Sequence, residues 1–164
     1  FLTFALYMGT GLFGRPIHGL IYSYLPPQLG QEIGAVEREG ETEKFSWYSE
    51  LEPALAEARI VQKPVFIDFT GYTCTNCRWM ETNIFEEIEV KQLFKQFVMT
   101  RLYTDGGKNY RENQKLEIER FGTAALPFYV VLSPFDEEIS RFPGMDTNVK
   151  KFVNFLEGAL KNNN

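Results

Sequence analysis

The chain contains two cysteines, Cys74 and Cys77, in the run Cys74-Thr75-Asn76-Cys77. They follow a short apolar run and a glycine. After Cys74, polar and apolar residues recur with the period of a helix, so we expect the pair to open a helix. A helix N-terminus presents unpaired N–H groups and a positive dipole end, which favour a thiolate. Since Cys77 lies one turn further on, the two sulfurs can close a small disulfide ring and exchange it with a partner. We predict that Cys74 attacks and that Cys77 is the buried resolving thiol.

Two other uses of the cysteine pair are weaker. A disulfide across two intervening residues closes almost no loop, so it would add little stability. A zinc site needs two more ligands, and the sole histidine, His18, lies far upstream.

Two carboxylates accompany the thiols. Asp68 stands between Ile67 and Phe69, six residues before Cys74. Burial would raise the pKa of Asp68 and make it a proton carrier near Cys77, whereas at a strand end it would simply face solvent. Glu81 lies four residues after Cys77, hence on the same helix face, although a solvated glutamate is an equally good interpretation. If both acids are near the thiols, the groups titrate as a coupled set.

Leu126-Pro127 precedes the apolar run of the third predicted strand. Because proline has no N–H to donate to a ladder, this position suits a strand start or a cis turn. The residues alone favour a trans bond, which is the commoner form of an X–Pro bond in folded proteins.

The elements that must position these residues follow from periodicity and turn signals. Ser49 and Glu52 have capping-box spacing and predict the start of the first helix. Helices that alternate with strands and end in a hairpin and a helix indicate an α/β fold with a small mixed β-sheet flanked by helices. The predicted elements are a helix over 50–61, a strand over 65–69, an interrupted helix over 74–97, a strand over 98–103, a helix over 112–121, strands over 127–132 and 139–142, and a helix over 149–160.

Composition limits the function classes. The 164 residues include 15 Phe, 8 Tyr and 2 Trp, enough bulky material for the core of one domain. The net charge is −5 and no cluster of Lys and Arg appears, so a nucleic-acid partner is not expected. Two cysteines are too few for a disulfide-stapled mini-protein or a four-thiolate zinc site.

The N-terminal part differs from the rest of the chain. Residues 1–25 carry one Arg and no acidic residue, and are broken by glycines and Pro16. Either they are the tail of a membrane domain followed by an interfacial stretch, or they are an apolar arm packed on the domain itself. Residues 28–43 are rich in Gly and Glu and read as a linker. We therefore divide the chain into an apolar segment with its linker, 1–43, and a folded domain, 44–164.

The segment PVFIDFTGYTCTNCRWME, from Pro64 to Glu81, resembles the active-site segment of the thioredoxin superfamily. Within it, the segment is most similar to the C-terminal periplasmic domains of DsbD-type thiol:disulfide interchange proteins, which carry two acids at the positions of Asp68 and Glu81. The resemblance covers about Lys44 to Leu160 and implies a thioredoxin-like fold with a cis bond at Leu126-Pro127. The apolar extension resembles the end of the membrane domain that precedes such a domain, and this favours the membrane-tail interpretation.

The resemblance also implies a function. Cys74, Cys77, Asp68 and Glu81 would be the catalytic residues of a protein-disulfide reductase that needs no metal and no organic cofactor. Its electrons would come from a membrane-embedded dithiol domain of the same protein and pass to periplasmic thiol-disulfide proteins, at the periplasmic face of the bacterial inner membrane. The isolated domain is expected to be monomeric. A free-standing oxidase or isomerase of the same fold is one alternative. A redox-inert module that holds extended peptides in a groove beside Pro127 is the other.

Four further residues would form the wall that meets the substrate. By the resemblance, they are Tyr72, Thr73, Leu126 and Pro127. Thioredoxins usually carry a tryptophan directly before the first cysteine, where this chain has Thr73, with Tyr72 before it. The dipeptide between the cysteines is Thr-Asn rather than Gly-Pro.

The division of the chain gives a first testable prediction. If residues 1–25 are a membrane-domain tail, a chain that begins at Gln31 should keep the melting temperature and insulin-reducing activity of the full chain. Thermal unfolding and turbidimetric insulin reduction measure both. A loss of several degrees would instead support an arm packed on the domain, because buried apolar surface contributes about 25 cal/mol per Å².

Overall fold

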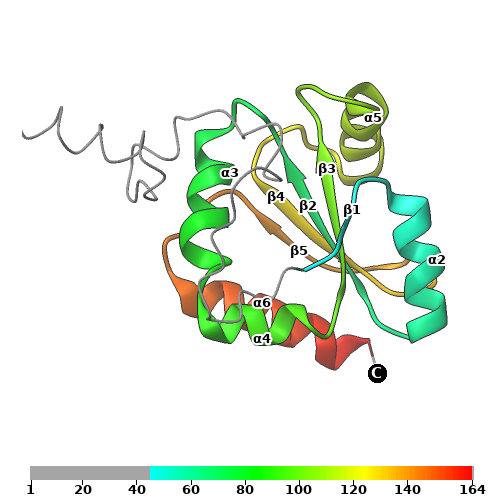
Figure 1. The fold of residues 1–164 in the computed structure, drawn as a ribbon, viewed down its shortest axis with the longest axis vertical. Coiled ribbons are helices and arrows are strands. Elements are labelled where there is room, and N and C mark those ends of the chain that lie inside the picture. The colour runs from blue at the N-terminus through cyan, green and yellow to red at the C-terminus, as the bar shows by residue number, and fades with distance from the viewer. Residues whose placement is uncertain (1–44, 164) are drawn as a thin grey trace, which may run out of the picture.

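The computed structural model describes residues 45–163, which form one five-stranded β-sheet with helices on both faces (Figure 1). The strand order is β1-β3-β2-β4-β5. β1 and β2 run parallel to β3, whereas β4 is antiparallel to both β2 and β5, so the sheet is mixed as the sequence predicts. The strands are β1 (Trp47–Tyr48), β2 (Val65–Thr70), β3 (Val98–Tyr103), β4 (Phe128–Leu132) and β5 (Glu138–Pro143).

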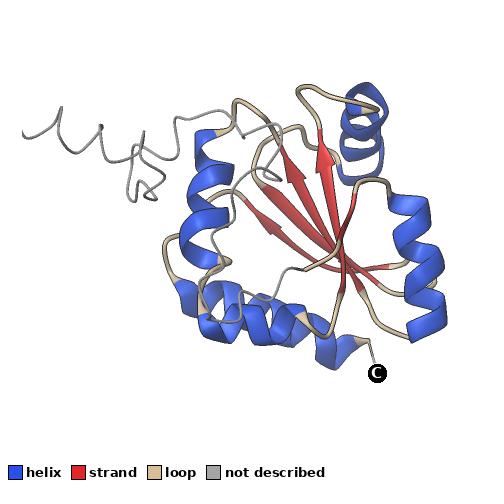
Figure 2. Cartoon of the chain, viewed as in Figure 1, coloured by secondary structure: helices blue, strands red, loops and turns tan. Residues whose placement is uncertain are grey.

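The helices divide between the two faces of the sheet (Figures 1 and 2). α2 (Leu51–Val61) and α5 (Tyr110–Phe121) cover one face over an aliphatic core. The other face carries an aromatic core beneath α4 (Ile88–Phe94), α6 (Val149–Asn162) and a π-helical turn, η2 (Met80–Ile84). η2 continues directly from α3 (Thr75–Trp79), the helix that the two cysteines open.

The central strand β2 determines what lies beneath the cysteines. Every residue of β2 is buried, and successive side chains point to opposite faces. Val65, Ile67 and Phe69 enter the aliphatic core, and Phe66 enters the aromatic core. Asp68 and Thr70 share the face of Phe66, so two polar side chains follow an aromatic one on the side that α3 covers. The predicted burial of Asp68 is confirmed.

The predicted capping box is wrong. Helix α2 has Glu50 at its N-cap rather than Ser49, and no side chain caps it. Pro53 then occupies the third helical position, where a capping side chain would need a backbone N–H that proline lacks. The Glu50 carboxylate instead accepts hydrogen bonds from Asn109 (3.1 Å) and Lys108 (3.3 Å), which fasten the start of α2 to the start of α5.

Most other elements lie within two residues of their predicted bounds. The interrupted helix over 74–97 resolves into α3, η2 and α4, with the break between Phe85 and Glu87. α5 begins two residues earlier than predicted, because Asn109 adopts a left-handed conformation (φ 61°) that starts the helix at Tyr110. The Leu126-Pro127 bond is cis, as the resemblance implies and against the preference of the residues alone.

Candidate active site

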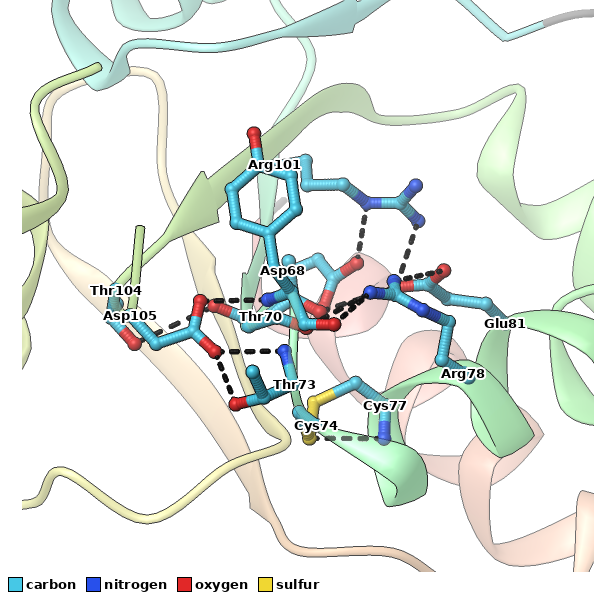
Figure 3. The surroundings of a disulfide bond; sticks show 12 residues. Asp68, Thr70, Thr73, Cys74, Cys77, Arg78, Glu81, Arg101, Thr104 and Asp105 are labelled. Atoms are coloured by element: carbon cyan, nitrogen blue, oxygen red, sulfur yellow. Dashed lines mark hydrogen bonds and ion pairs between the residues drawn. A yellow bond between two sulfur atoms is a disulfide. The ribbon is translucent and has the colours of Figure 1, made fainter. Parts of the chain in front are cut away.

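The two cysteines form a disulfide at the start of α3 (Figure 3). Cys74 is the N-cap residue, and its Sγ accepts a hydrogen bond from the backbone N–H of Cys77 at 3.1 Å. Cys77 is fully buried, whereas Cys74 is partly exposed. A partner can therefore reach only the first sulfur, and the helix N-terminus stabilises negative charge on it.

A tight turn connects the disulfide to the sheet. β2 ends at Thr70, and the backbone N–H of Cys74 donates to the carbonyl of Gly71 at 3.2 Å. Leu126 lies against this turn, since a Cβ built on Gly71 would come within 3.0 Å of its Cδ1. Because Phe128 pairs with Phe69, the cis proline between Leu126 and Phe128 lies at the same end of the sheet as the cysteines.

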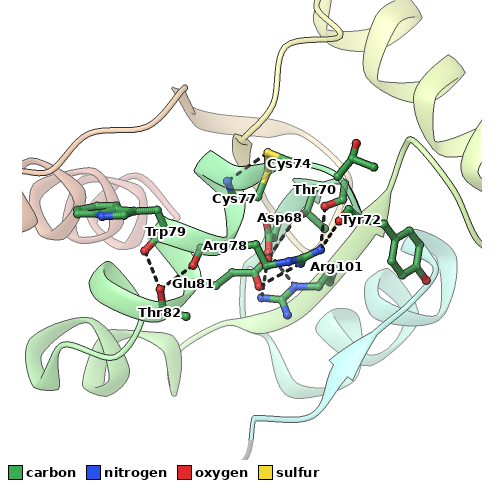
Figure 4. Close-up of polar contacts among 12 residues, drawn as sticks. Asp68, Thr70, Tyr72, Cys74, Cys77, Arg78, Trp79, Glu81, Thr82 and Arg101 are labelled. Atoms are coloured by element: carbon green, nitrogen blue, oxygen red, sulfur yellow. Dashed lines mark hydrogen bonds and ion pairs between the residues drawn. A yellow bond between two sulfur atoms is a disulfide. The ribbon is translucent and has the colours of Figure 1, made fainter. Parts of the chain in front are cut away.

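Beneath the disulfide lies a cluster of two acids and two arginines, Asp68, Glu81, Arg78 and Arg101 (Figure 4). Arg101 is opposite Asp68 in the β2–β3 register, and its Nε donates to Asp68 Oδ2 at 2.8 Å. Its Nη2 lies 3.8 Å from Glu81 Oε1, which also accepts from the Thr70 hydroxyl at 3.2 Å. Arg101 thus joins the two predicted acids through one guanidinium.

The second arginine connects this cluster to the turn before the cysteines. Arg78 is buried, with Nη1 3.8 Å from Glu81 Oε2. Its Nη2 donates to the carbonyl oxygens of Tyr72 (2.7 Å) and Gly71 (3.3 Å). Since a guanidinium presents five donors in a rigid plane, it can bind a carboxylate and two carbonyls at once.

The environment of Asp68 shifts its titration. Burial raises the pKa of Asp68 to about 7, while the charge of Arg101 opposes the rise and the charge of Glu81 adds to it. Oδ2 is held by Arg101, but Oδ1 is buried and accepts no hydrogen bond from the described residues. Figures 3 and 4 both show Asp68 between the disulfide and Arg101. A carboxyl group in this state can exchange a proton near neutral pH.

The predicted substrate-facing residues separate into two groups. Thr73 is exposed beside Cys74, and Leu126 and Pro127 lie at the same sheet end. Tyr72 instead stacks on Tyr103, with ring centroids 4.2 Å apart, and Figure 4 shows its ring directed away from the two cysteines. It forms part of the support for the turn rather than of a wall facing Cys74.

Sequence reasoning missed three charged residues of this site, Arg78, Arg101 and Asp105. Arg78 directly follows the second cysteine, and Arg101 interrupts the apolar pattern of the predicted strand 98–103, so each left a signal. Asp105 lies between the predicted strand 98–103 and the predicted helix 112–121, yet it accepts hydrogen bonds from the backbone N–H groups of Tyr72 and Thr73.

A mixed sheet with a disulfide opening a helix, a buried acid beneath it and a cis proline at the same sheet end defines the class of thioredoxin-fold proteins. The chain belongs to the thioredoxin-like family, whose sequence model matches residues 46–134, more than half of the chain. Its Cys74–Cys77 pair is consistent with a thiol–disulfide oxidoreductase.

Solved structures share this fold. A thioredoxin from Thermus thermophilus is 24% identical with a TM-score of 0.62, over 73% of this chain and 89% of that chain. The oxidoreductase DsbH is 22% identical with a TM-score of 0.57, over 76% and 94%. The oxidised C-terminal domain of DsbD from Neisseria meningitidis is 20% identical with a TM-score of 0.54, over 68% and 97%. At these identities the likeness concerns the fold. No curated protein sequence matches the chain.

Residues 45–163 contain neither a metal-binding cluster nor a membrane-spanning helix. No group of three or more His, Cys, Asp or Glu side chains in this part of the chain is arranged to hold a metal ion. None of its helices is long and apolar enough to cross a membrane. The predicted membrane tail, the linker and His18 lie outside the described residues.

The raised pKa of Asp68 predicts how stability depends on pH. Between about pH 4 and 7 the unfolded chain ionises Asp68 while the folded protein keeps it protonated, so the wild type loses stability as pH rises through this range. Asp68→Asn removes this loss. Its free energy of unfolding, relative to the wild type, should rise by on the order of 3 kcal/mol between pH 4 and pH 8. Urea unfolding at several pH values measures the difference, and a difference that does not change with pH would contradict the assignment.

Proposed function

We propose that this domain is a protein-disulfide reductase that passes electrons from a membrane-embedded dithiol to periplasmic disulfide proteins. The observation that carries the proposal is the Cys74–Cys77 disulfide at the start of α3, directly above the carboxyl group of Asp68. One sulfur is accessible and the other is buried, which is what successive attack and resolution require.

The two thiols carry the electrons of the exchange. In the reduced domain, the Cys74 thiolate attacks a partner's disulfide, forms a mixed disulfide and releases one partner sulfur as a thiolate. Cys77, as a thiolate, then attacks Cys74 Sγ, which restores the Cys74–Cys77 disulfide and releases the second partner sulfur. Two electrons reach the partner, and its two thiolates take up two protons. An upstream dithiol then reduces the domain by the same two steps in reverse.

Asp68 is the acceptor of the Cys77 proton in this scheme. Cys77 is buried, so its thiol must lose a proton to a nearby base before it attacks. With a pKa of about 7, the Asp68 carboxylate can accept this proton on Oδ1, which has no other partner among the described residues. Arg101 keeps the other oxygen in place and favours the ionised form that acts as the base.

Two features support the relay direction over a free-standing oxidase or isomerase. The segment around the cysteines resembles that of DsbD-type domains, including the second acid at Glu81, and this acid contacts both arginines of the cluster. Residues 1–25 resemble the end of a preceding membrane domain. The periplasmic location, the inner-membrane dithiol and the periplasmic partners belong to this proposal, as does the absence of a metal or organic cofactor.

Trapping of mixed disulfides tests the exchange. Cys77→Ser should accumulate covalent complexes with disulfide-containing proteins, because the mixed disulfide on Cys74 then lacks its resolving thiol. Insulin and a periplasmic extract serve as substrates, and non-reducing gels followed by mass spectrometry identify the bonds. The reduced wild type should reduce insulin without accumulating complexes.

The matched control is Cys74→Ser, in which the one remaining thiol is that of the buried Cys77. It should trap little, at least tenfold less than Cys77→Ser. Complexes formed mainly by Cys74→Ser would reverse the two roles. If neither variant forms complexes and the wild type leaves insulin disulfides intact, the domain is a redox-inert binding module instead.

A further inference from the structure

Asp105, in the loop after β3, holds the two residues that precede the first cysteine (Figure 3). Its Oδ1 accepts the backbone N–H of Tyr72 at 2.7 Å. Its Oδ2 accepts the backbone N–H of Thr73 at 2.9 Å and the Thr73 hydroxyl at 2.7 Å. Three hydrogen bonds to one ionised carboxylate form a strong local constraint, because charge-assisted bonds are about twice as strong as neutral ones.

The carboxylate also lies so close to the turn that a Cβ at position 71 would have to displace it. A Cβ on Gly71 would lie 2.6 Å from Asp105 Oδ2 and 2.8 Å from its Cγ, closer than Cβ atoms approach other atoms. The backbone of Gly71 is not left-handed, so the close approach, and not backbone conformation, explains the glycine.

Aromatic packing of Tyr72 also holds the turn before the cysteines. The ring of Tyr72 lies over the loop that carries Asp105, since a Cβ on Gly107 would come within 2.9 Å of its hydroxyl oxygen. Tyr103, at the end of β3, stacks on the same ring at 4.2 Å. Burial acts to raise the pKa of Asp105, but the hydrogen bonds from Thr73 and Tyr72 outweigh it and lower the pKa, so the carboxylate stays charged.

We propose that Asp105 is a positioning residue for thiol–disulfide exchange: it clamps Tyr72 and Thr73 so that Cys74 stays at the N-cap of α3 when the disulfide is open. This inference rests on the proposed function. In the reduced protein nothing covalent keeps the two sulfurs together, so the shape of the turn sets how readily they meet. A clamped turn raises the effective concentration of Cys74 at Cys77 and favours closure of the ring.

The equilibrium with glutathione measures this directly. Asp105→Asn keeps the size of the side chain but replaces one acceptor oxygen with an NH₂ donor, so the three bonds cannot all form. We expect the equilibrium constant for closing the Cys74–Cys77 disulfide to fall about tenfold, equivalent to ~30 mV. A substitution that destabilises both redox forms equally lowers the melting temperature but leaves this constant unchanged.

Two further variants separate the clamp from the charge. Asp105→Glu keeps the charge but lengthens the side chain by one methylene, which moves the carboxylate from the position that accepts all three bonds, so it should resemble Asp105→Asn. A wild-type constant in Asp105→Glu would assign the effect to charge and overturn the proposal. Thr73→Val removes only the hydroxyl bond and should shift the constant in the same direction by a smaller factor. If Asp105→Asn does not fold, an unchanged constant in Thr73→Val overturns the proposal.

Asp136→Asn is the matched control. Asp136 also binds through its carboxylate, to Arg120 at 2.8 Å, but it lies in the β4–β5 turn at the opposite end of the sheet. Its glutathione equilibrium should equal that of the wild type. Failure of the proposed function would look different, because the wild-type disulfide itself would then not exchange with glutathione. A wild type that exchanges, with Asp105 variants that share its constant, would refute the positioning role alone.

Discussion

The ion pair between Asp68 and Arg101 is the interaction on which the site depends. A carboxylate in the middle of a fully buried strand is costly unless it is paired or protonated. In this protein Arg101 pairs with one oxygen of Asp68 at 2.8 Å. Burial nevertheless raises the pKa of Asp68 to about 7, so the carboxyl group is also protonated over part of the pH range. The guanidinium is itself placed by its contact with the ring of Trp47, whose centroid lies 4.2 Å from Cζ. Trp47, on the short edge strand β1, thus helps to hold the Arg101 guanidinium beside Asp68 on the central strand β2.

The parallel pairing of β2 and β3 explains why β3 and the loop after it supply two residues of the site, Arg101 and Asp105. The register places Arg101 beside Asp68, beneath the disulfide. β3 ends two residues later at Tyr103, and Asp105, in the loop that follows, reaches the turn after β2. The dithiol is therefore held from below by a charge cluster and from the side by a carboxylate clamp. Arg78 links the two, because it contacts Glu81 in the cluster and the carbonyls of Gly71 and Tyr72 in the turn.

The sequence revealed the parts of this site that depend on local chain geometry. The spacing of Cys74 and Cys77, the acid inside an apolar run at Asp68, and the proline ahead of an apolar strand each have a local physical signature. Arg101 and Asp105 act on residues more than thirty positions away, and only the strand register brings them there. The failed capping box shows the converse: the spacing of Ser49 and Glu52 was correct, but the helix starts at Leu51, which puts Pro53 where a capping N–H is needed.

The carboxyl group of Asp68 changes its protonation near neutral pH, and the proton transfer proposed for the two thiols depends on this change. A carbon-13 NMR titration of side-chain carboxyl groups in the oxidised protein measures this, with the Asp68 signal identified by its absence in Asp68→Asn. We expect a midpoint of about 7 for this signal. A midpoint near 4, the value of an exposed aspartate, would show that Arg101 fully compensates the burial and that Asp68 is not the proton carrier of the dithiol.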